Sequence, residues 1–309
     1  MKKIAALFTG QGSQKIGMGK SFYEASDEAK RIFAVADEVL GFKLSQLCFE
    51  GPIETLTLTE NAQPALLLVS YVAYKLSGIK PTAGAGHSLG EYSALVATQS
   101  LRFEDAISLV HKRGKYMQKA VPAGTGKMLA VMGPEEKEIL EVISKISNGD
   151  SIVEIANLNT PGQTVVSGNN SGAEEFTKSA TEKGWKVIPL NVSAPFHSSL
   201  MKSAADNLAV DLDSTEFNAP QFPVYANVTA RAVTDGAEAR ELLKQQVCGS
   251  VRWFESVRNM IREHGITHTI EFGAADVLTK MQKRIDDSVV KLFIGDTESL
   301  DKVTKEVLL

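Results

Sequence analysis

Residues 81–98 read PTAGAGHSLGEYSALVAT, and this segment carries the most informative pattern in the chain. The apolar segment Pro81–Gly86 runs into the pattern Gly-x-Ser-x-Gly at Gly86–Gly90, and an apolar helical pattern continues through Glu91–Thr98. Glycines on either side of a serine allow the sharp backbone turn that joins a strand directly to a helix. The stretch therefore predicts a strand-turn-helix unit that exposes Ser88 on its turn.

Strands and helices alternate outward from this unit. Ile4–Thr9 is a short apolar run typical of a buried strand. The apolar spacing predicts helices over Ser21–Val39, Asn61–Leu76 and Phe103–Ala120. Such alternation favours an α/β architecture with a mainly parallel sheet.

The middle of the chain has a different order of elements: strand, helix, strand, strand, helix, strand. This βαββαβ order is typical of a ferredoxin-like domain. The expected elements are the strands Met128–Met132, Ile152–Ala156, Thr164–Ser167 and Trp185–Leu190 and the helices Pro134–Ile146 and Glu174–Lys183, with a turn at Asn159–Gly162. We therefore predict a small domain at residues 126–192, inserted into a large domain made of residues 1–125 and 193–309.

Composition and charge exclude several classes of protein. The 309 residues are 43% apolar and 23% charged, which is ordinary for a globular protein and excludes disorder. Lys and Arg total 33 against 37 Asp and Glu without a dense basic run, so we expect no nucleic-acid partner. The uncharged stretch Asn61–Tyr74 has 14 residues, fewer than the about 20 that span a bilayer, so we expect no membrane segment. The two cysteines, Cys48 and Cys248, are few enough to fit a reducing cytoplasm.

Ser88 is the candidate nucleophile. The helix after it aims its first N–H groups at the place where an oxyanion can form. The alternative is a glycine-rich turn in which a serine caps the helix. A base is needed as well, and the five histidines are His87, His111, His197, His264 and His268. His197 is favoured because it lies in a loop with proline and small residues just after the small domain. No acid stands out as a third member, which favours a Ser–His dyad.

Patterns for bound cofactors fail on inspection. In Gly10–Lys15, lysine stands where a dinucleotide fingerprint needs its third glycine. Gly19-Lys20-Ser21 lacks the first glycine of a phosphate-binding loop, because position 14 is glutamine. No spacing of cysteine and histidine indicates zinc. We therefore expect neither a nucleotide cofactor nor a metal.

Several motifs, taken in order along essentially the whole chain, resemble those of the malonyl-CoA:acyl carrier protein transacylases. The matching segments are Gly10–Gln14, Gly86–Leu95, Arg113–Gln118 with Val121-Pro122, Asn159–Gln163 and Pro195–His197. The resemblance implies a hydrolase-like large α/β domain with the small ferredoxin-like domain inserted in it. A set of ordered motifs is far more specific than any one of them.

The resemblance also implies a role for each matching residue. Ser88 would take the malonyl group as an ester, and His197 would act as its base and then as the acid for the leaving thiolate. Arg113 would hold the free carboxylate of the malonyl group, which suits a planar guanidinium that forms two parallel bonds. Without the other motifs, Arg113 would be interpreted as an ordinary helix-surface residue.

Three further positions match residues that support this chemistry in the family. The backbone N–H groups of Gln11 and Leu89 would form the oxyanion hole. Gln246 would orient the histidine through its backbone carbonyl, which would explain the missing acid. Taken alone, Gln246 would be interpreted as an ordinary residue at a helix end.

The implied function is ping-pong transfer of malonyl from malonyl-CoA to the phosphopantetheine thiol of an acyl carrier protein, in fatty-acid biosynthesis. No resident cofactor is implied, because malonyl-CoA is a substrate and the carrier protein brings its own phosphopantetheine. We expect a cytoplasmic monomer that meets an acidic carrier protein through a basic patch, with Lys112, Lys115 and Lys119 as candidates.

The sequence departs from the family near both ends. Thr9 stands where proline is usual, and Gly273-Ala274-Ala275-Asp276 replaces a Gly-Pro-Gly-Lys segment, which predicts a differently shaped loop. Phe196 is bulkier than the small residue that many stand-alone members carry before the histidine. In this respect the sequence resembles the malonyl-selective acyltransferases of polyketide assembly lines. Tolerance for methylmalonyl is left open.

Three alternatives stay open. A discrete acyltransferase that loads a polyketide synthase carrier protein shares every motif. A serine hydrolase would need an acid after the nucleophile and a histidine near the C-terminus, His264 or His268, and would leave Arg113 without a role. A carrier-binding scaffold with an inactive site is disfavoured by Ser88, His197 and Arg113 all being present.

Overall fold

The computed structural model describes residues 2–122, 124–146, 149–192 and 194–308. A six-stranded sheet runs in the order β10-β9-β1-β2-β7-β8, and neighbours from β10 to β7 are parallel while β8 is antiparallel to β7. The strands are β1 (Ile4–Phe8), β2 (Ala83–Gly86), β7 (Val224–Tyr225), β8 (Ala232–Val233), β9 (His268–Phe272) and β10 (Val290–Ile294). The predicted mainly parallel sheet is confirmed.

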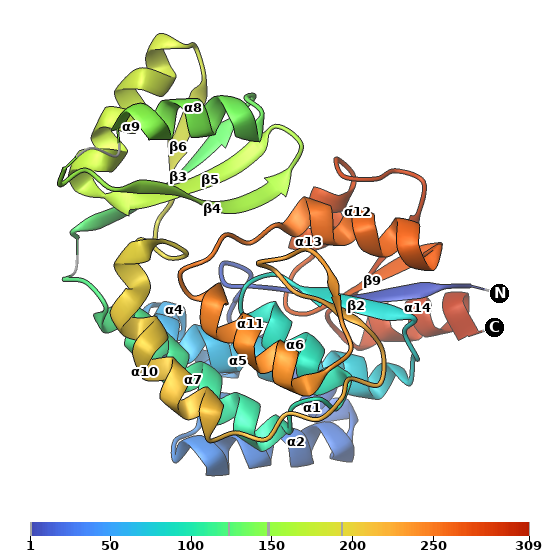
Figure 1. Cartoon of the computed structure of the whole chain (residues 1–309). Coiled ribbons are helices and arrows are strands. Elements are labelled where there is room, and N and C mark those ends of the chain that lie inside the picture. The colour runs from blue at the N-terminus through green and yellow to red at the C-terminus, as the bar shows by residue number, and fades with distance from the viewer. Residues whose placement is uncertain (1, 123, 147–148, 193, 309) are drawn as a thin grey trace.

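Helices cover both faces of this sheet (Figure 1). The helices of the large unit that precede the small unit in the chain are α1 (Lys20–Ala25), α2 (Asp27–Leu40), α3 (Leu44–Glu50), α4 (Ile53–Thr57), α5 (Thr59–Ser77), α6 (Gly90–Ala97) and α7 (Phe103–Lys119). After the small unit follow the short 3-10 helix η1 (Ser199–Met201), α10 (Lys202–Asp213), α11 (Gly236–Gln246), α12 (Trp253–His264), α13 (Val277–Gln282) and α14 (Thr297–Leu308).

The central position of β1 and β2 brings the predicted site loops together. All five residues of β1 are buried, and Phe8 lies opposite Gly86 of β2 in parallel register. Parallel strands end at the same edge of a sheet, and ligands bind at that edge. The loop after β1, which contains Gln11, is therefore adjacent to the turn at Ser88.

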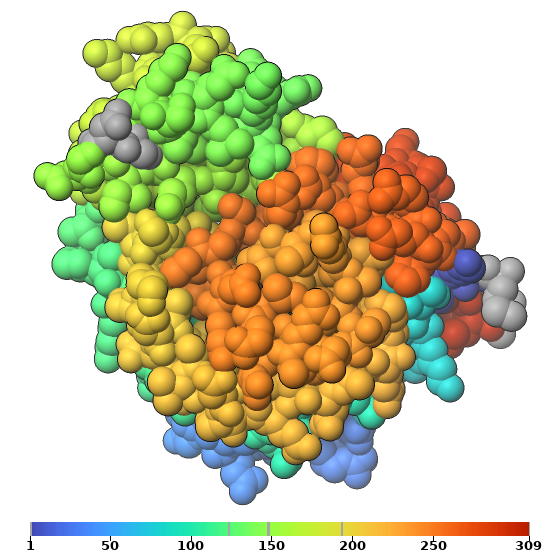
Figure 2. Space-filling view, in the orientation of Figure 1, coloured from blue at the N-terminus to red at the C-terminus, as the bar shows by residue number. Residues whose placement is uncertain are grey.

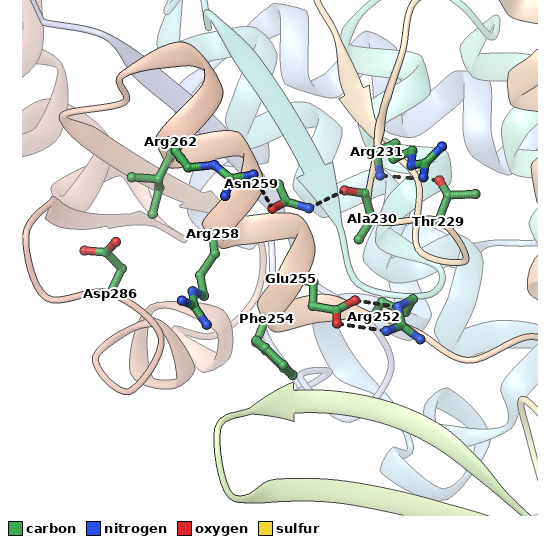
Figure 3. A pocket seen from close by; sticks show the side chains of 11 residues that line it. Thr229, Ala230, Arg231, Arg252, Phe254, Glu255, Arg258, Asn259, Arg262 and Asp286 are labelled. Atoms are coloured by element: carbon green, nitrogen blue, oxygen red, sulfur yellow. Dashed lines mark hydrogen bonds and ion pairs between the residues drawn. The ribbon is translucent and has the colours of Figure 1, made fainter. Parts of the chain in front are cut away.

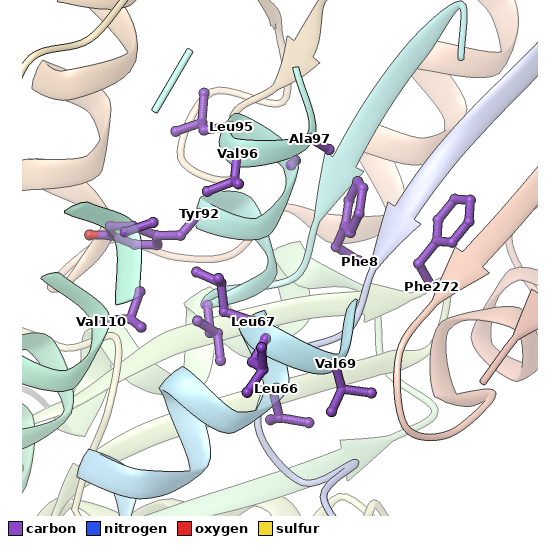
Figure 4. Close-up of a cluster of buried hydrophobic side chains, with 14 of the residues drawn as sticks. Phe8, Leu66, Leu67, Val69, Tyr92, Leu95, Val96, Ala97, Val110 and Phe272 are labelled. Carbon is purple, nitrogen blue, oxygen red and sulfur yellow. The ribbon is translucent and has the colours of Figure 1, made fainter. Parts of the chain in front are cut away.

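The main core fills the space between the sheet and α5, α6 and α7 (Figure 4). Phe8 and Phe272 stack with their ring centroids 5.7 Å apart. Leu66 and Val69 of α5 and Tyr92 of α6 are completely buried in the same cluster. Burial of this kind holds α6, and with it the turn that precedes α6, rigidly against the sheet.

A second sheet forms the small unit, in the order β4-β5-β3-β6 with antiparallel neighbours. Its elements are β3 (Gly126–Met132), α8 (Glu136–Ile146), β4 (Val153–Thr160), β5 (Gln163–Asn169), α9 (Asn170–Glu182) and β6 (Lys186–Pro189). It has its own apolar core between the sheet and the two helices. The predicted βαββαβ order is confirmed. The exact domain limits stay a prediction, and Ser193 at one of them lies outside the described residues.

The small unit is attached to the large one along β4. Leu158 N–H donates to the Val251 carbonyl at 2.9 Å, and Val251 N–H donates to the Ala156 carbonyl at 2.8 Å. In Figure 2 the green small unit lies over the large unit, whose visible face consists mostly of the yellow and orange segments. Of the helices that the structure describes, none combines the length and the apolar character that a membrane-spanning segment requires.

Two local expectations differ from the structure, one in a helix and one in the length of a turn. The helix predicted over Ser21–Val39 is interrupted at Ser26, whose extended backbone ends α1 while its side chain accepts the Ala29 N–H and so begins α2. The expected turn at Asn159–Gly162 is shorter, because β4 continues through Thr160 and Gly162 supplies the positive φ of 74° that the turn needs.

Candidate functional site

Ser88 lies on a sharply turned backbone with φ of 51°, a conformation that is strained for a non-glycine residue. The glycines beside it are required by space. A Cβ on Gly86 would lie 1.9 Å from the Gly90 carbonyl carbon, and a Cβ on Gly90 would lie 2.1 Å from the Phe8 carbonyl oxygen. The predicted strand-turn-helix unit is thus present, with no room for a side chain at either glycine.

His197 faces Ser88 across the site. Ser88 Oγ lies 2.8 Å from His197 Nε2, and His197 Nδ1 lies 2.9 Å from the Gln246 carbonyl oxygen and 3.1 Å from that of Gly249. A carbonyl only accepts, so Nδ1 carries the hydrogen and Nε2 is left to accept the hydrogen of the Ser88 hydroxyl. The dyad geometry expected for Ser88, His197 and Gln246 is therefore present.

The surroundings of His197 keep its ring neutral. Burial is the main cause that lowers the pKa of His197 from 6.5 to about 3; the positive charge of Arg113 contributes to the lowering, and the two hydrogen bonds to carbonyl groups oppose it. A neutral imidazole is the form that can accept a proton. The ring is therefore available as a base throughout the neutral pH range.

Arg113 reaches the site from α7 and is 1% exposed. Its Nη1 donates to Gln63 Oε1 at 2.8 Å, and its Nη2 donates to Gln246 Oε1 at 3.0 Å and to Ser88 Oγ at 3.1 Å. All of these acceptors are uncharged. A buried guanidinium held by neutral partners beside the nucleophile is suited to receive a carboxylate.

The helix α7 can approach closely enough because of Gly114. A Cβ at this position would lie 2.6 Å from Glu60 Cα and from the Thr59 carbonyl oxygen. Glycine therefore lets α7 contact the start of α5 and brings Arg113 up to Ser88.

Gln11 and Leu89 lie where the oxyanion donors were expected. Gln11 follows β1, Leu89 precedes α6, and both line the same cavity as Ser88. Within the described residues, neither backbone N–H donates a hydrogen bond to another part of the chain. Their assignment as oxyanion donors stays a prediction.

The cavity that contains these groups has a volume of about 230 Å³ and lies between the two units. Besides Ser88, His197 and Arg113, it is lined by Gln11, Gln63, His87, Leu89, Met128, Asn157, Asn159, Leu190, Phe196 and Met281, among others. Gln246 is completely buried behind it. Phe196, next to His197 in the chain, is 7% exposed and is among the residues that line the cavity.

A larger hollow of about 660 Å³ lies beside α12 (Figure 3). Arginines line it, and Arg252 is paired with Glu255 in Figure 3 by two dashed contacts. No serine or histidine is among the residues that line it. The groups capable of acyl chemistry therefore gather in the smaller cavity.

The other histidines do not offer a second base. His87 Nε2 lies 2.8 Å from Asn159 Oδ1, and His111 Nδ1 lies 2.7 Å from the Glu60 carbonyl oxygen. His264 lies with its ring against Tyr225. His268 begins β9 and is therefore at the opposite edge of the sheet from Ser88. The bases that a hydrolase would need do not reach the nucleophile.

Asn227 is a residue of the site that the sequence did not predict. Its Oδ1 accepts the Ser88 N–H at 2.7 Å, and its Nδ2 donates to the Gly86 carbonyl at 2.7 Å. It thus holds the strained turn from both sides. In the sequence Asn227 belongs to an Asn-Val-Thr triplet, which carries no signal of this contact.

The departures from the family pattern near both ends of the chain are accommodated locally. Glu271 is completely buried, and its two oxygens accept the N–H groups of Leu278 and Thr279 at the start of α13. Asp276 pairs with Lys280 at 2.8 Å. Thr9 is buried with its Oγ1 3.5 Å from Ser70 Oγ.

Among the described residues, no group of three or more histidine, cysteine and acidic side chains is arranged to hold a metal.

Comparison with known proteins gives matches over nearly the whole chain. The family model of the acyl transferase domain matches residues 6–291. The malonyl CoA-acyl carrier protein transacylase of Bacillus subtilis strain 168 is 47% identical over 305 residues, which are 97% of this chain and 96% of that protein. The protein of the same name from Escherichia coli K12 is 39% identical over 305 residues, 97% of this chain and 98% of that one.

Solved structures give the same result. An acyl-carrier-protein S-malonyltransferase from Burkholderia pseudomallei superposes with a TM-score of 0.94 at 40% identity, covering 98% of this chain and 99% of that one. A chain from the solved complex of a type II PKS acyl-carrier protein with its malonyl-transacylase also matches, with a TM-score of 0.94 at 40% identity. The match covers 99% of this chain and 100% of that one. Both matches include the large and the small unit.

Proposed function

The chain belongs to the malonyl-CoA:acyl carrier protein transacylase family of acyltransferases, and on that premise we propose that it transfers malonyl from malonyl-CoA to the phosphopantetheine thiol of an acyl carrier protein, in fatty-acid biosynthesis. One observation supports this most strongly: Ser88 Oγ lies within hydrogen-bond distance of both His197 Nε2 and Arg113 Nη2. A base and a carboxylate-binding group on either side of one hydroxyl suit an acyl group that carries its own carboxylate.

In the first half-reaction, His197 Nε2 takes the hydroxyl proton as Ser88 Oγ attacks the thioester carbonyl of malonyl-CoA. The developing oxyanion receives the N–H groups of Gln11 and Leu89. The carbon–sulfur bond then breaks, Nε2 returns the proton to the CoA thiolate, and malonyl remains on Ser88 as an ester.

In the second half-reaction, the carrier-protein thiol gives its proton to His197 Nε2 and attacks the ester carbonyl. The carbon–oxygen bond breaks and Ser88 Oγ regains the proton from Nε2. Neither half changes an oxidation state, so the chemistry requires no redox cofactor. The expectations for a cytoplasmic monomer with no resident cofactor remain predictions.

Arg113 would bind the malonyl carboxylate during both half-reactions. Its three present acceptors are neutral, so a carboxylate would be its strongest partner in the cavity. Acetyl-CoA lacks this group and would lose the contact.

Intact-protein mass spectrometry after brief mixing with malonyl-CoA, acetyl-CoA or methylmalonyl-CoA tests the proposal. We expect a malonyl adduct on the wild type, weak adducts from the other two donors, and no adduct on Ser88→Ala. Rapid release of free malonate without any carrier protein would support a hydrolase instead. Absence of both adduct and malonate would refute the proposed substrate.

A polyketide carrier protein is the second candidate acceptor. It is favoured by Phe196 in the cavity and by the match to a transacylase solved with a type II PKS carrier protein. Transfer rates to the two kinds of carrier protein, measured side by side, would separate the candidates. Of the predicted docking lysines, Lys112 is paired with Asp211, so Lys115 and Lys119 are the ones to test by charge reversal.

A further inference from the structure

Glu91 is a buried carboxylate that the proposed reaction does not use. It lies in the first turn of α6, three residues after Ser88, and is 3% exposed. Its Oε2 accepts the Asn227 backbone N–H at 2.9 Å and the Gln246 Nε2 at 2.8 Å. It does not line the catalytic cavity. Its partners, however, are the residues that hold the site together.

Gln246 connects the two functional ends of the site. Its backbone carbonyl accepts from His197 Nδ1, and its side-chain Oε1 accepts from Arg113 Nη2 at 3.0 Å. The Gln246 amide can accept the hydrogen bond from Arg113 only if its oxygen points toward the guanidinium. If the amide were turned over, its NH₂ group would face another donor.

The contacts of the amide nitrogen determine that orientation. Gln246 Nε2 donates to Glu91 Oε2, and it also lies 3.0 Å from the Ser88 carbonyl oxygen and 3.3 Å from Asn227 Oδ1. Glu91 Oε2 also accepts the Asn227 backbone N–H, so this oxygen is an acceptor toward the Gln246 amide as well. The shortest of these contacts therefore keeps nitrogen toward α6 and leaves oxygen toward α7.

We propose that Glu91 is a positioning residue that sets the Gln246 amide, and through it the place of Arg113 relative to Ser88 and His197, so that it determines the preference for an acyl group bearing a carboxylate. This inference deepens the proposed function and rests on it. Acetyl transfer needs the dyad but not Arg113, so a defect in this contact changes the malonyl-to-acetyl ratio and not only the overall rate.

Two conservative variants separate contact from charge. Glu91→Gln keeps the length of the side chain and an oxygen that can accept from Gln246 Nε2. Glu91→Asp keeps the charge, but it is one methylene shorter and withdraws from Gln246. We expect the ratio of kcat/KM for malonyl-CoA over acetyl-CoA to stay within about threefold of wild type in Glu91→Gln and to fall about tenfold or more in Glu91→Asp.

Gln246→Met gives an independent measurement, since it retains the backbone carbonyl for His197 but replaces the amide oxygen that Arg113 uses with a weakly accepting thioether. We expect the same fall in the ratio, and no further fall when Glu91→Asp is added. Circular dichroism and thermal unfolding show whether each variant folds; if Glu91→Asp does not, Gln246→Met and Glu91→Gln still decide the matter.

The proposal is overturned if every variant lowers kcat/KM for malonyl-CoA and for acetyl-CoA by the same factor, since the role of Glu91 is then structural. It is also overturned if Glu91→Gln loses the ratio while Glu91→Asp keeps it, or if Gln246→Met keeps the ratio. A wild type that forms no malonyl adduct would refute the proposed function and this inference with it. An adduct together with unchanged ratios would refute this inference alone.

Discussion

The Nδ1 of His197 donates to the main-chain carbonyl of Gln246 at 2.9 Å, in the place where many serine enzymes have a carboxylate. A carbonyl fixes the tautomer and the ring orientation as an acid would, but it carries no full negative charge to stabilise an imidazolium. Burial and the nearby charge of Arg113 lower the pKa of His197, so the ring is a well-oriented but weak base.

Arg113→Ala is expected to lower kcat/KM for malonyl-CoA by about 10- to 100-fold, the effect of losing a charge-assisted hydrogen bond of about 1.5–3 kcal/mol. Use of acetyl-CoA should improve, because the cavity remains while the carboxylate partner is gone. Arg113→Lys, which keeps the charge without the planar fork, should lie between. Steady-state kinetics with both donors gives the answer. Equal losses on both donors would mean that Arg113 has a structural role.

The pH profile of acylation should have no acid limb near pH 6.5. The base must be neutral, and since the pKa of His197 is lowered to about 3, it stays neutral down to that region. Removing the charge of Arg113 removes one cause of the lowering, so the limb should move to higher pH in Arg113→Ala, measured with acetyl-CoA. The measurement is kcat/KM against pH for the free enzyme. A limb at the same pH in both proteins would contradict the assigned cause.

Asn227→Ala should destabilise the fold and slow acylation. It leaves the Ser88 N–H and the Gly86 carbonyl without their partner in a buried place, at a cost of about 2–4 kcal/mol in the free energy of unfolding. The strained turn at Ser88 also loses its restraint. Urea unfolding and adduct formation measure the two effects. The matched control is Thr229→Ala, an exposed residue of the same loop, which should change neither.

Glu271→Gln should flatten the dependence of stability on pH. Burial raises the pKa of Glu271 from 4.5 to about 7, and the hydrogen bonds from α13 offset part of the rise. Between these values the folded protein holds a proton that the unfolded chain releases, so stability falls as pH rises from about 4.5 to 7. Removing the group should reduce this slope by up to about 1.4 kcal/mol per pH unit.

Urea unfolding at pH 5, 6, 7 and 8 measures the slope. Some slope should persist, since burial also raises the pKa of Glu91 to about 7. Glu182→Gln, at an exposed position on α9, is the control and should leave the slope as it is. An unchanged slope in Glu271→Gln would refute the prediction.

Local sequence determined the framework of this protein. The strand before Ser88, the glycines beside it and the helix after it depend on steric limits within a few residues, so the pattern at Gly86–Gly90 predicts the turn directly. The βαββαβ order of the small unit is likewise predicted by short-range apolar spacing and by turn residues. Ser26 shows the limit of such reasoning, since a single capping contact divided a helix that the apolar spacing made continuous.

The supporting contacts of the site, in contrast, depend on how distant segments of the chain pack together. Gln246 is 158 residues from Ser88 in the chain, and Asn227 is 139 residues away, yet both bond to it. Glu91 was visible in the nucleophile motif, but nothing in the sequence says that its carboxylate meets Gln246. The hydrogen-bond partners of buried polar groups depend on which surfaces pack together. A local pattern in the sequence does not predict contacts between residues that lie far apart in the chain.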